Sequence, residues 1–83
     1  MGKKEKLFKK AKESPTNLSF NELCRLAIAV GFVFRNQNGS HKTYKHPTLK
    51  GIMNFQPDKK DKSKAKLYQT KKLVEYIEEK KLI

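Results

Sequence analysis

The stretch FVFRNQNGSHKTYKH, residues 32–46, contains two runs of β-branched and aromatic residues on either side of Asn38-Gly39. An Asn-Gly pair tolerates positive φ angles and is a strong short-range signal of a two-residue hairpin turn. The pattern therefore predicts two antiparallel strands, and a tight turn at this pair would place Asn36 opposite His41. An isolated hairpin is marginally stable in water, so the sequence around it must supply further strands and helices.

The segments on either side of the hairpin supply these elements. A capping box begins at Ser19 and predicts the start of a helix, while Gly31 predicts its end. A third short strand is expected over residues 50–56, and a second amphipathic helix over residues 70–81. The residues expected on the core sides of the two helices are Phe20, Leu23, Cys24, Ala27, Val30, Leu73, Val74 and Ile77.

This element order predicts an α+β fold, a two-layer α-β-β-β-α sandwich in which the helices cover one sheet face and the other face stays partly open. A chain of 83 residues forms one small domain. We place this domain at residues 19–83 and a basic N-terminal arm or short helix at residues 1–18. A helix in the arm would have Leu7, Phe8 and Ala11 on one side.

The net charge points to a polyanionic partner. The sequence has 20 Lys and Arg against 8 Asp and Glu, which gives a net charge of +12, and two lysine-rich blocks could follow a phosphate backbone. A lysine run can also be a solvated surface, and a basic arm can lie on an anionic membrane, although two large apolar side chains make a weak anchor. The candidate RNA-binding residues are Lys42, Lys45, Lys50, Lys59, Lys60, Lys62, Lys64 and Lys66.

Cys24 is the single cysteine, which excludes an internal disulfide and a zinc cluster built on several cysteines. Its leucine neighbours indicate a buried thiol rather than a nucleophile. The sequence has no apolar run of signal-peptide or membrane-spanning length. We therefore expect a soluble protein of the reducing cytoplasm that has no membrane partner.

His41 is the candidate catalytic residue. An imidazole can take up or release a proton near neutral pH, and the neighbouring Lys42 and Lys45 could bind phosphates of an RNA chain. A lone histidine in a strand can equally be structural. A metal site built on His41 and His46 lacks further ligands, because Asp58 is too distant in the sequence to be counted. We therefore expect neither a metal nor another cofactor.

The residues around His41 resemble those of HicA, the mRNA interferase toxin of bacterial HicA-HicB toxin-antitoxin modules. The resemblance rests on Gly39-Ser40-His41, on Tyr44, on His46-Pro47 and on Gly31-Phe32. The segment NFQPDKKDKSKAKLYQTKKLVEYIEE also looks like the C-terminal half of the longer HicA sequences. The similarity covers roughly residues 19–80.

The resemblance implies a fold like that of double-stranded-RNA-binding domains, cleavage of mRNA without a metal, and an acidic HicB-type antitoxin that covers the active surface. It assigns catalysis to His41, the shape of the turn to Gly39, and support of the histidine to Ser40. The roles of the N-terminal arm and of residues 58–66 do not follow from it, because the shortest family members lack them. Two other functions stay open, a small RNA-binding module that does not cleave and a basic ribosome-associated protein.

Overall fold

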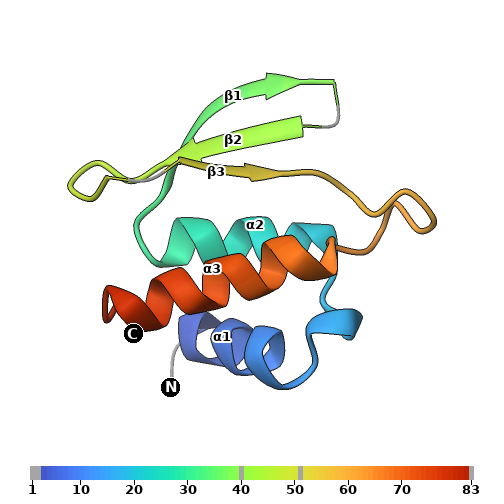
Figure 1. The fold of residues 1–83 in the computed structure, drawn as a ribbon, viewed down its shortest axis with the longest axis horizontal. Helices are drawn as coiled ribbons and strands as arrows, with labels where there is room; N and C mark the ends of the chain where they lie inside the picture. The colour runs from blue at the N-terminus through green and yellow to red at the C-terminus, as the bar shows by residue number, and fades with distance from the viewer. Residues whose placement is uncertain (1–2, 40, 51, 83) are drawn as a thin grey trace.

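The computed structural model describes residues 3–39, 41–50 and 52–82, which form three α-helices beneath one antiparallel sheet (Figure 1). The sheet has the strand order β1-β2-β3. This arrangement confirms the α+β class and the predicted helix-strand-strand-strand-helix order. The elements are α1 (Lys3–Glu13), a short 3-10 turn (Pro15–Asn17), α2 (Phe20–Ala29), β1 (Val33–Asn38), β2 (His41–Lys45), β3 (Ile52–Phe55) and α3 (Leu67–Glu79).

Helix α2 begins and ends where the sequence predicts. The Ser19 hydroxyl accepts a hydrogen bond from the backbone N–H of Glu22 at 3.1 Å, and the Glu22 carboxylate accepts one from the N–H of Ser19 at 3.0 Å, which completes the capping box. At the other end Gly31 has a φ of +105° and the N–H of Phe32 donates to the carbonyl of Ala27 at 3.0 Å. Together with the bond from the N–H of Gly31 to the carbonyl of Ile28 at 3.0 Å, this bond forms a Schellman motif, which needs a left-handed residue after the helix.

The hairpin forms, but its register differs from the expected one. Asn38 pairs with His41, so the connection falls at residues 39 and 40, one residue later than a turn at Asn38-Gly39 would require. Asn36 pairs with Thr43, and the expectation that Asn36 lies opposite His41 is therefore wrong. Gly39 has a φ of +64°, so the glycine still supplies a left-handed residue when the connection is shifted.

A β-bulge accompanies this shift. The pairing of β1 with β2 is irregular between Phe34 and Asn36, so Arg35 is an extra residue of β1. Phe34 lies opposite Tyr44 with 5.7 Å between their ring centroids, while Val33 lies opposite Lys45. The bulge therefore keeps the aromatic side chains on the helix side of the sheet.

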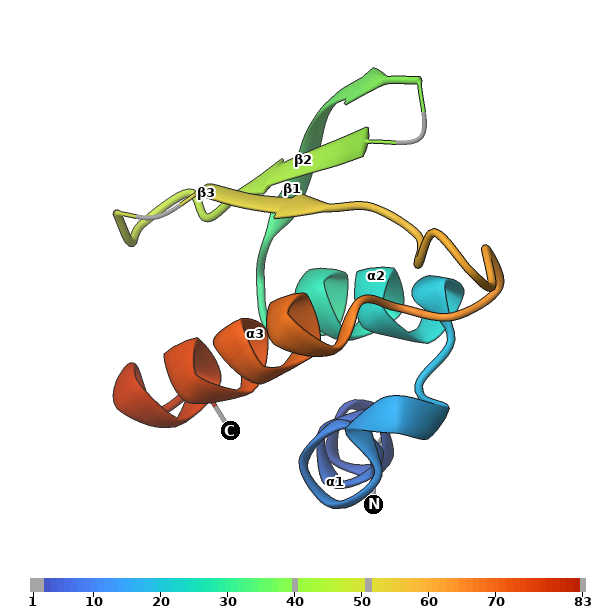
Figure 2. The ribbon, with the colours of Figure 1, turned by 45° about the vertical axis from the view of Figure 1, so that its right-hand side comes forward.

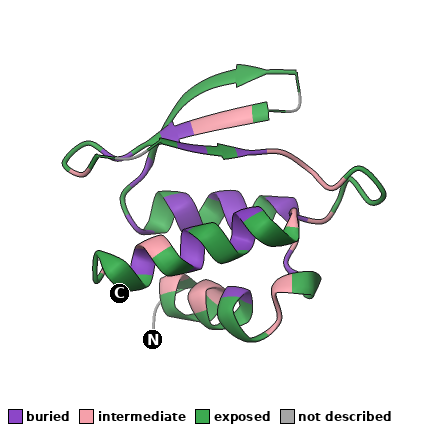
Figure 3. Cartoon of the chain, viewed as in Figure 1, coloured by how far each residue is buried: buried purple, intermediate pink, exposed green. Residues whose placement is uncertain are grey.

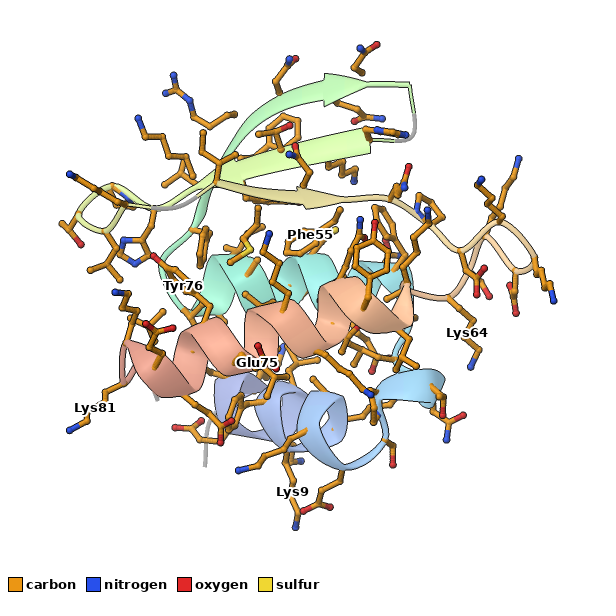
Figure 4. All side chains as sticks on the ribbon, in the orientation of Figure 1. Lys9, Phe55, Lys64, Glu75, Tyr76 and Lys81 are labelled. Carbon is orange, nitrogen blue, oxygen red and sulfur yellow. The ribbon has the colours of Figure 1, made fainter. Side chains whose placement is uncertain are left out.

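Helix α3 starts one turn earlier than expected, at Leu67 instead of Thr70, and ends at Glu79. Thr70 is not a terminal residue, because its side chain is buried on the core side and its hydroxyl donates to the carbonyl of Lys66 at 3.2 Å. Strand β3 lies within the expected segment. From β3, Phe55 points toward the helices (Figure 4).

The core lies between the inner face of the sheet and helices α2 and α3, and Figure 3 shows this burial pattern. All the core residues predicted for the two helices are buried, and Cys24 is among them. The predicted burial of the Cys24 thiol is therefore confirmed, and this burial raises its pKa. Burial also raises the pKa of Tyr44, which faces α2 from β2.

The N-terminal segment packs against the domain. Helix α1 lies on the side of α2 and α3 that is turned away from the sheet, as Figures 1 and 2 show from two directions. Ala11 is buried, and Lys10 forms an ion pair with Glu22 at 2.9 Å. Leu18 is fully buried, and its carbonyl accepts a hydrogen bond from the N–H of Ala65 at 3.0 Å. A domain boundary after residue 18 stays a prediction.

The outer sheet face is open. Val33, Lys45 and Ile52 lie side by side across the three strands, and the two apolar side chains are 51% and 56% exposed. In the neighbouring row, the Thr43 hydroxyl donates to the Asn54 side-chain carbonyl at 2.7 Å. None of the helices in the described ranges is long and apolar enough to cross a lipid bilayer.

Candidate functional site

His41 lies at one end of the sheet, beside a small cavity. It is the first residue of β2, it pairs with Asn38, and it is exposed. The cavity has a volume of about 250 Å³. Its lining residues are His41, Gln56, Pro57, Asp58, Lys59 and Lys62.

The loop after β3 is held in place by backbone hydrogen bonds. The N–H of Asp58 donates to the carbonyl of Lys64 at 2.9 Å, and Pro57 and Ala65 form an isolated antiparallel bridge. Just before the loop, the N–H of Gln56 donates to the side-chain carbonyl of the buried Gln69 at 3.0 Å. The loop therefore has a defined position, and Figure 1 shows it at the same end of the molecule as the hairpin connection.

Asp58 is the residue that sequence reasoning missed. It was set aside because of its distance from His41 along the chain, but the structure places both side chains at one cavity. The pairing of Lys42 with Phe55 explains this, because it brings the residues just outside the pair, His41 and Gln56, to the same end of the two strands. The signal that could have found Asp58 is the β2-β3 register. The Asp58 carboxylate also accepts a hydrogen bond from the N–H of Lys60 at 3.1 Å.

The predicted RNA-binding lysines separate into groups. Lys59 and Lys62 line the cavity of His41, and Lys59 also lines a groove with Lys60 and Lys66. The groove has a volume of about 610 Å³. Its full lining is Asp58, Lys59, Lys60, Lys66, Leu67, Tyr68 and Lys71, of which Asp58, Leu67, Tyr68 and Lys71 were not predicted from the sequence.

The remaining lysines lie elsewhere. The ammonium of Lys42 is 5.6 Å from the centre of the Phe20 ring, on the helix side of the sheet. Lys45 lies on the outer face and lines a cavity with Arg35. Lys50 lies in the loop that follows β2, where its carbonyl accepts a hydrogen bond from the Tyr76 hydroxyl at 2.9 Å. Lys64, labelled in Figure 4, is half-buried in the loop before α3.

The motif residues that precede His41 are only partly visible. Gly39 has a φ of +64°, and its carbonyl accepts a hydrogen bond from the Gln37 side-chain amide at 2.9 Å. The role in shaping the turn that the resemblance implies for Gly39 stays a prediction. Ser40, the expected support of the histidine, lies outside the described residues.

His46 has a structural environment. Its Nδ1 accepts hydrogen bonds from the N–H groups of Thr48 and Leu49 at 3.3 Å, which leaves the ring proton on Nε2, 3.3 Å from the carbonyl of Val30. The ring is buried and meets Phe32 edge-on at 5.3 Å. A Cβ on Gly31 would lie 2.8 Å from its Nε2. The Gly-Phe and His-Pro motifs thus form one packing cluster, separate from His41.

A metal centre finds no support in the described residues. Within residues 3–39, 41–50 and 52–82, no group of three or more His, Cys, Asp and Glu side chains could hold a metal ion. The site contains an imidazole, a carboxylate and ammonium groups. Such groups can transfer protons and bind a phosphate.

Comparison with known proteins identifies the family of the chain. The family model described as "HicA toxin of bacterial toxin-antitoxin" matches residues 20–75, which is more than half of the chain. The chain belongs to the HicA toxin family. HicA toxins are generally ribonucleases, and each acts in a module with a cognate antitoxin. No curated protein and no solved structure matches the chain.

Proposed function

We propose that this HicA family member is a toxin endoribonuclease that cuts mRNA without a metal and uses His41 as its catalytic residue. The observation that carries the proposal is the cavity in which His41, Asp58, Lys59 and Lys62 meet. Imidazole and carboxylate groups can transfer protons, and ammonium groups can bind the phosphate and offset its growing charge.

The proposed reaction is attack of a ribose 2′-OH on the adjacent phosphorus. A base accepts the proton of the 2′-OH as the new O–P bond forms, and an acid donates a proton to the departing 5′-oxygen as the old P–O bond breaks. The products are a 2′,3′-cyclic phosphate and a free 5′-hydroxyl. His41 takes one of the two proton-transfer roles, and Asp58 is the protein group best placed for the other. Lys59 and Lys62 support the charge on the phosphate.

Cleavage of a defined single-stranded RNA in EDTA tests the catalytic role of His41. A positioned general acid or base contributes about 10² to 10⁴-fold in rate, so we expect a loss of this size in His41→Ala. The fold should survive, because His41 is exposed at the start of a strand. RNA binding should change little. Full activity in His41→Ala, or an unchanged rate with a 2′-deoxy nucleotide at the cut site, would exclude this mechanism.

Asp58 and Asp61 offer a matched pair for the second proton-transfer role. Asp61 lies in the same loop but does not line the cavity of His41, and its carboxylate accepts hydrogen bonds from Ser63. We expect Asp58→Asn to lower kcat and to remove one limb of its pH profile, while Asp61→Asn leaves both unchanged. Equal effects of the two substitutions on kcat would mean that the negative charge of the loop, and not proton transfer by Asp58, supports catalysis.

The proposed partner is an acidic HicB-type antitoxin in the cytoplasm. The chain carries a net charge of +12, and opposite charge speeds association. The exposed Val33 and Ile52 on either side of Lys45 give such a partner an apolar area to bury on the outer sheet face. We expect the antitoxin to cover this face and reach His41. Hydrogen exchange of the complex that protects neither β2 nor the loop at residues 57–65 would contradict this.

A further inference from the structure

The 610 Å³ groove next to the His41 cavity combines positive charge with an exposed aromatic ring. Tyr68 is 63% exposed, and Leu67 beside it is 41% exposed. The ammonium group of Lys66 lies 6.0 Å from the centre of the Tyr68 ring. Lys59, Lys60 and Lys71 complete the basic lining of the groove.

Tyr68 is the most exposed of the three tyrosines. Tyr44 is buried in the core, and the Tyr76 hydroxyl donates a hydrogen bond to the carbonyl of Lys50. The Tyr68 ring lies in the first turn of α3, and its hydroxyl takes part in one long contact of 3.4 Å from the side-chain amide of Gln69. Such a large exposed ring leaves its face available to a ligand.

The groove and the His41 cavity are neighbours that share two lining residues. Asp58 and Lys59 line both spaces. An RNA strand whose scissile phosphate lies at His41 can therefore extend past Lys59 toward Tyr68. A nucleotide in the groove would meet ammonium groups suited to its phosphate and an aromatic face suited to its base.

We propose that this groove is a subsite for one unpaired nucleotide next to the scissile one, with its base stacked on Tyr68 and its phosphate held by Lys59, Lys60, Lys66 or Lys71. The proposal rests on the proposed ribonuclease function. Every base has a flat face, so stacking on Tyr68 selects single-stranded RNA over paired RNA without selecting a sequence.

Binding measurements in a His41→Ala background separate this subsite from catalysis. The probe is a short fluorescein-labelled single-stranded RNA. Base-aromatic stacking corresponds to an affinity change of about 5- to 150-fold, so we expect Tyr68→Ala to weaken binding within this range. Tyr68→Phe keeps the ring and should bind like its parent. Ile28→Ala removes a 55% exposed side chain on α2 and is the control for loss of apolar surface.

The salt dependence of binding separates stacking from charge. Lys71→Ala should make the negative slope of log K against log salt less steep by about 0.7, because one phosphate contact is lost. Tyr68→Ala should reduce affinity at every salt concentration and leave this slope unchanged. A change of slope in Tyr68→Ala would show that its effect is electrostatic and would overturn the stacking role.

Abasic substitution identifies the nucleotide that occupies the groove. When the abasic site is moved along the RNA, we expect one position at which it lowers the affinity for the parent protein. At this position it should not lower the affinity for Tyr68→Ala any further. If the RNA affinity of Tyr68→Ala stays within twofold of the parent, the subsite is overturned. This holds even if the substitution weakens binding of the acidic antitoxin. If the wild-type protein does not cleave RNA but Tyr68→Ala weakens RNA binding, the ribonuclease function is refuted and the nucleotide-binding subsite is supported.

Discussion

Gly31 is the residue at which two constraints meet. Its φ of +105° is strained for any residue with a Cβ, and a Cβ there would lie 2.8 Å from Nε2 of His46. The histidine cannot easily move, because both ring nitrogens are engaged with backbone groups of Val30, Thr48 and Leu49. The glycine therefore fixes the end of α2 and the packing of the loop after β2 together.

We predict that Gly31→Ala lowers the free energy of unfolding by more than about 1 kcal/mol, since left-handed backbone disfavours alanine and the clash adds to the strain. Denaturant titration measures the loss. Gly39→Ala is the control, because Gly39 also has a positive φ, +64°, but no described atom lies within 4 Å of a Cβ there. Equal losses at both positions would mean that the contact with His46 has no energetic consequence.

Glu22 links the capping box to helix α1. The hydrogen bond from the N–H of Ser19 lowers the pKa of Glu22, and the ion pair with Lys10 lowers it further, while burial opposes both. The ionised form therefore stabilises the fold. This contribution is complete above the ordinary glutamate pKa, about 4.3, and is lost as the pH falls through the lowered pKa of the folded state.

We predict that Glu22→Gln lowers Tm by a few degrees at pH 7, which corresponds to roughly 1 kcal/mol or less, and that the difference from the wild type shrinks at pH 3. Thermal unfolding followed by circular dichroism measures both values. Glu75→Gln is the control, because Glu75 is exposed on α3 and labelled in Figure 4. A Tm difference for Glu22→Gln that is independent of pH would refute the electrostatic origin.

At the scale of elements, the segment that joins α1 to α2 is part of the core. Leu18 is fully buried. Backbone hydrogen bonds connect residues 18–20 to residues 63–65, and each segment donates one bond to the other. One of these bonds runs from the N–H of Phe20 to the carbonyl of Ser63 at 2.9 Å. The N-terminal segment and the loop before α3 therefore stabilise each other.

We predict that Leu18→Ala lowers the free energy of unfolding by about 2–5 kcal/mol, because it leaves a cavity in a packed interior. Ile28→Ala is the matched control, since Ile28 is 55% exposed and should cost less than about 0.5 kcal/mol. Urea unfolding curves of the two variants provide the comparison. Similar midpoints would show that the packing around Leu18 contributes little.

The elements themselves could be predicted because their signals are local. The capping box, the apolar spacing of α2 and α3 and the glycine after α2 each act within a few residues. The hairpin register could not be predicted, since Asn38-Gly39 favours one turn but does not exclude a turn one residue later with a bulge at Arg35. The packing of α1 could not be predicted either, because three partly apolar positions fit both a free arm and a docked helix.

At the scale of the whole molecule, the basic surface should make RNA binding sensitive to salt. With four to six lysine contacts to phosphates, as we expect, the slope of log K against log salt should be about −3 to −4 for single-stranded RNA. Fluorescence anisotropy over a series of salt concentrations measures this slope. An affinity that is equal at low and physiological salt would remove the electrostatic basis of the proposed function.

The candidate site shows what the sequence can and cannot reveal about a surface. His41 was identified by its motif, because Gly39 and the histidine are near neighbours in the chain. Asp58 and Tyr68 were not, because strand pairing brings Asp58 to the His41 cavity and the position of α3 brings Tyr68 to the neighbouring groove. Long-range geometry of this kind follows from the register of β2 with β3, which a single sequence leaves undetermined.

The bulge at Arg35 has a consequence for how this protein behaves in concentrated solution. Strand β1 is an edge strand with all six residues exposed, and an open edge can pair with the edge of another molecule and start aggregation. A bulge interrupts the regular row of backbone donors and acceptors and twists the edge away from such pairing. Removal of Arg35 should straighten β1 and increase light scattering, whereas Arg35→Ala keeps the extra residue and should leave light scattering unchanged. An irregular hairpin would thus keep a toxin with an exposed sheet edge from associating with itself.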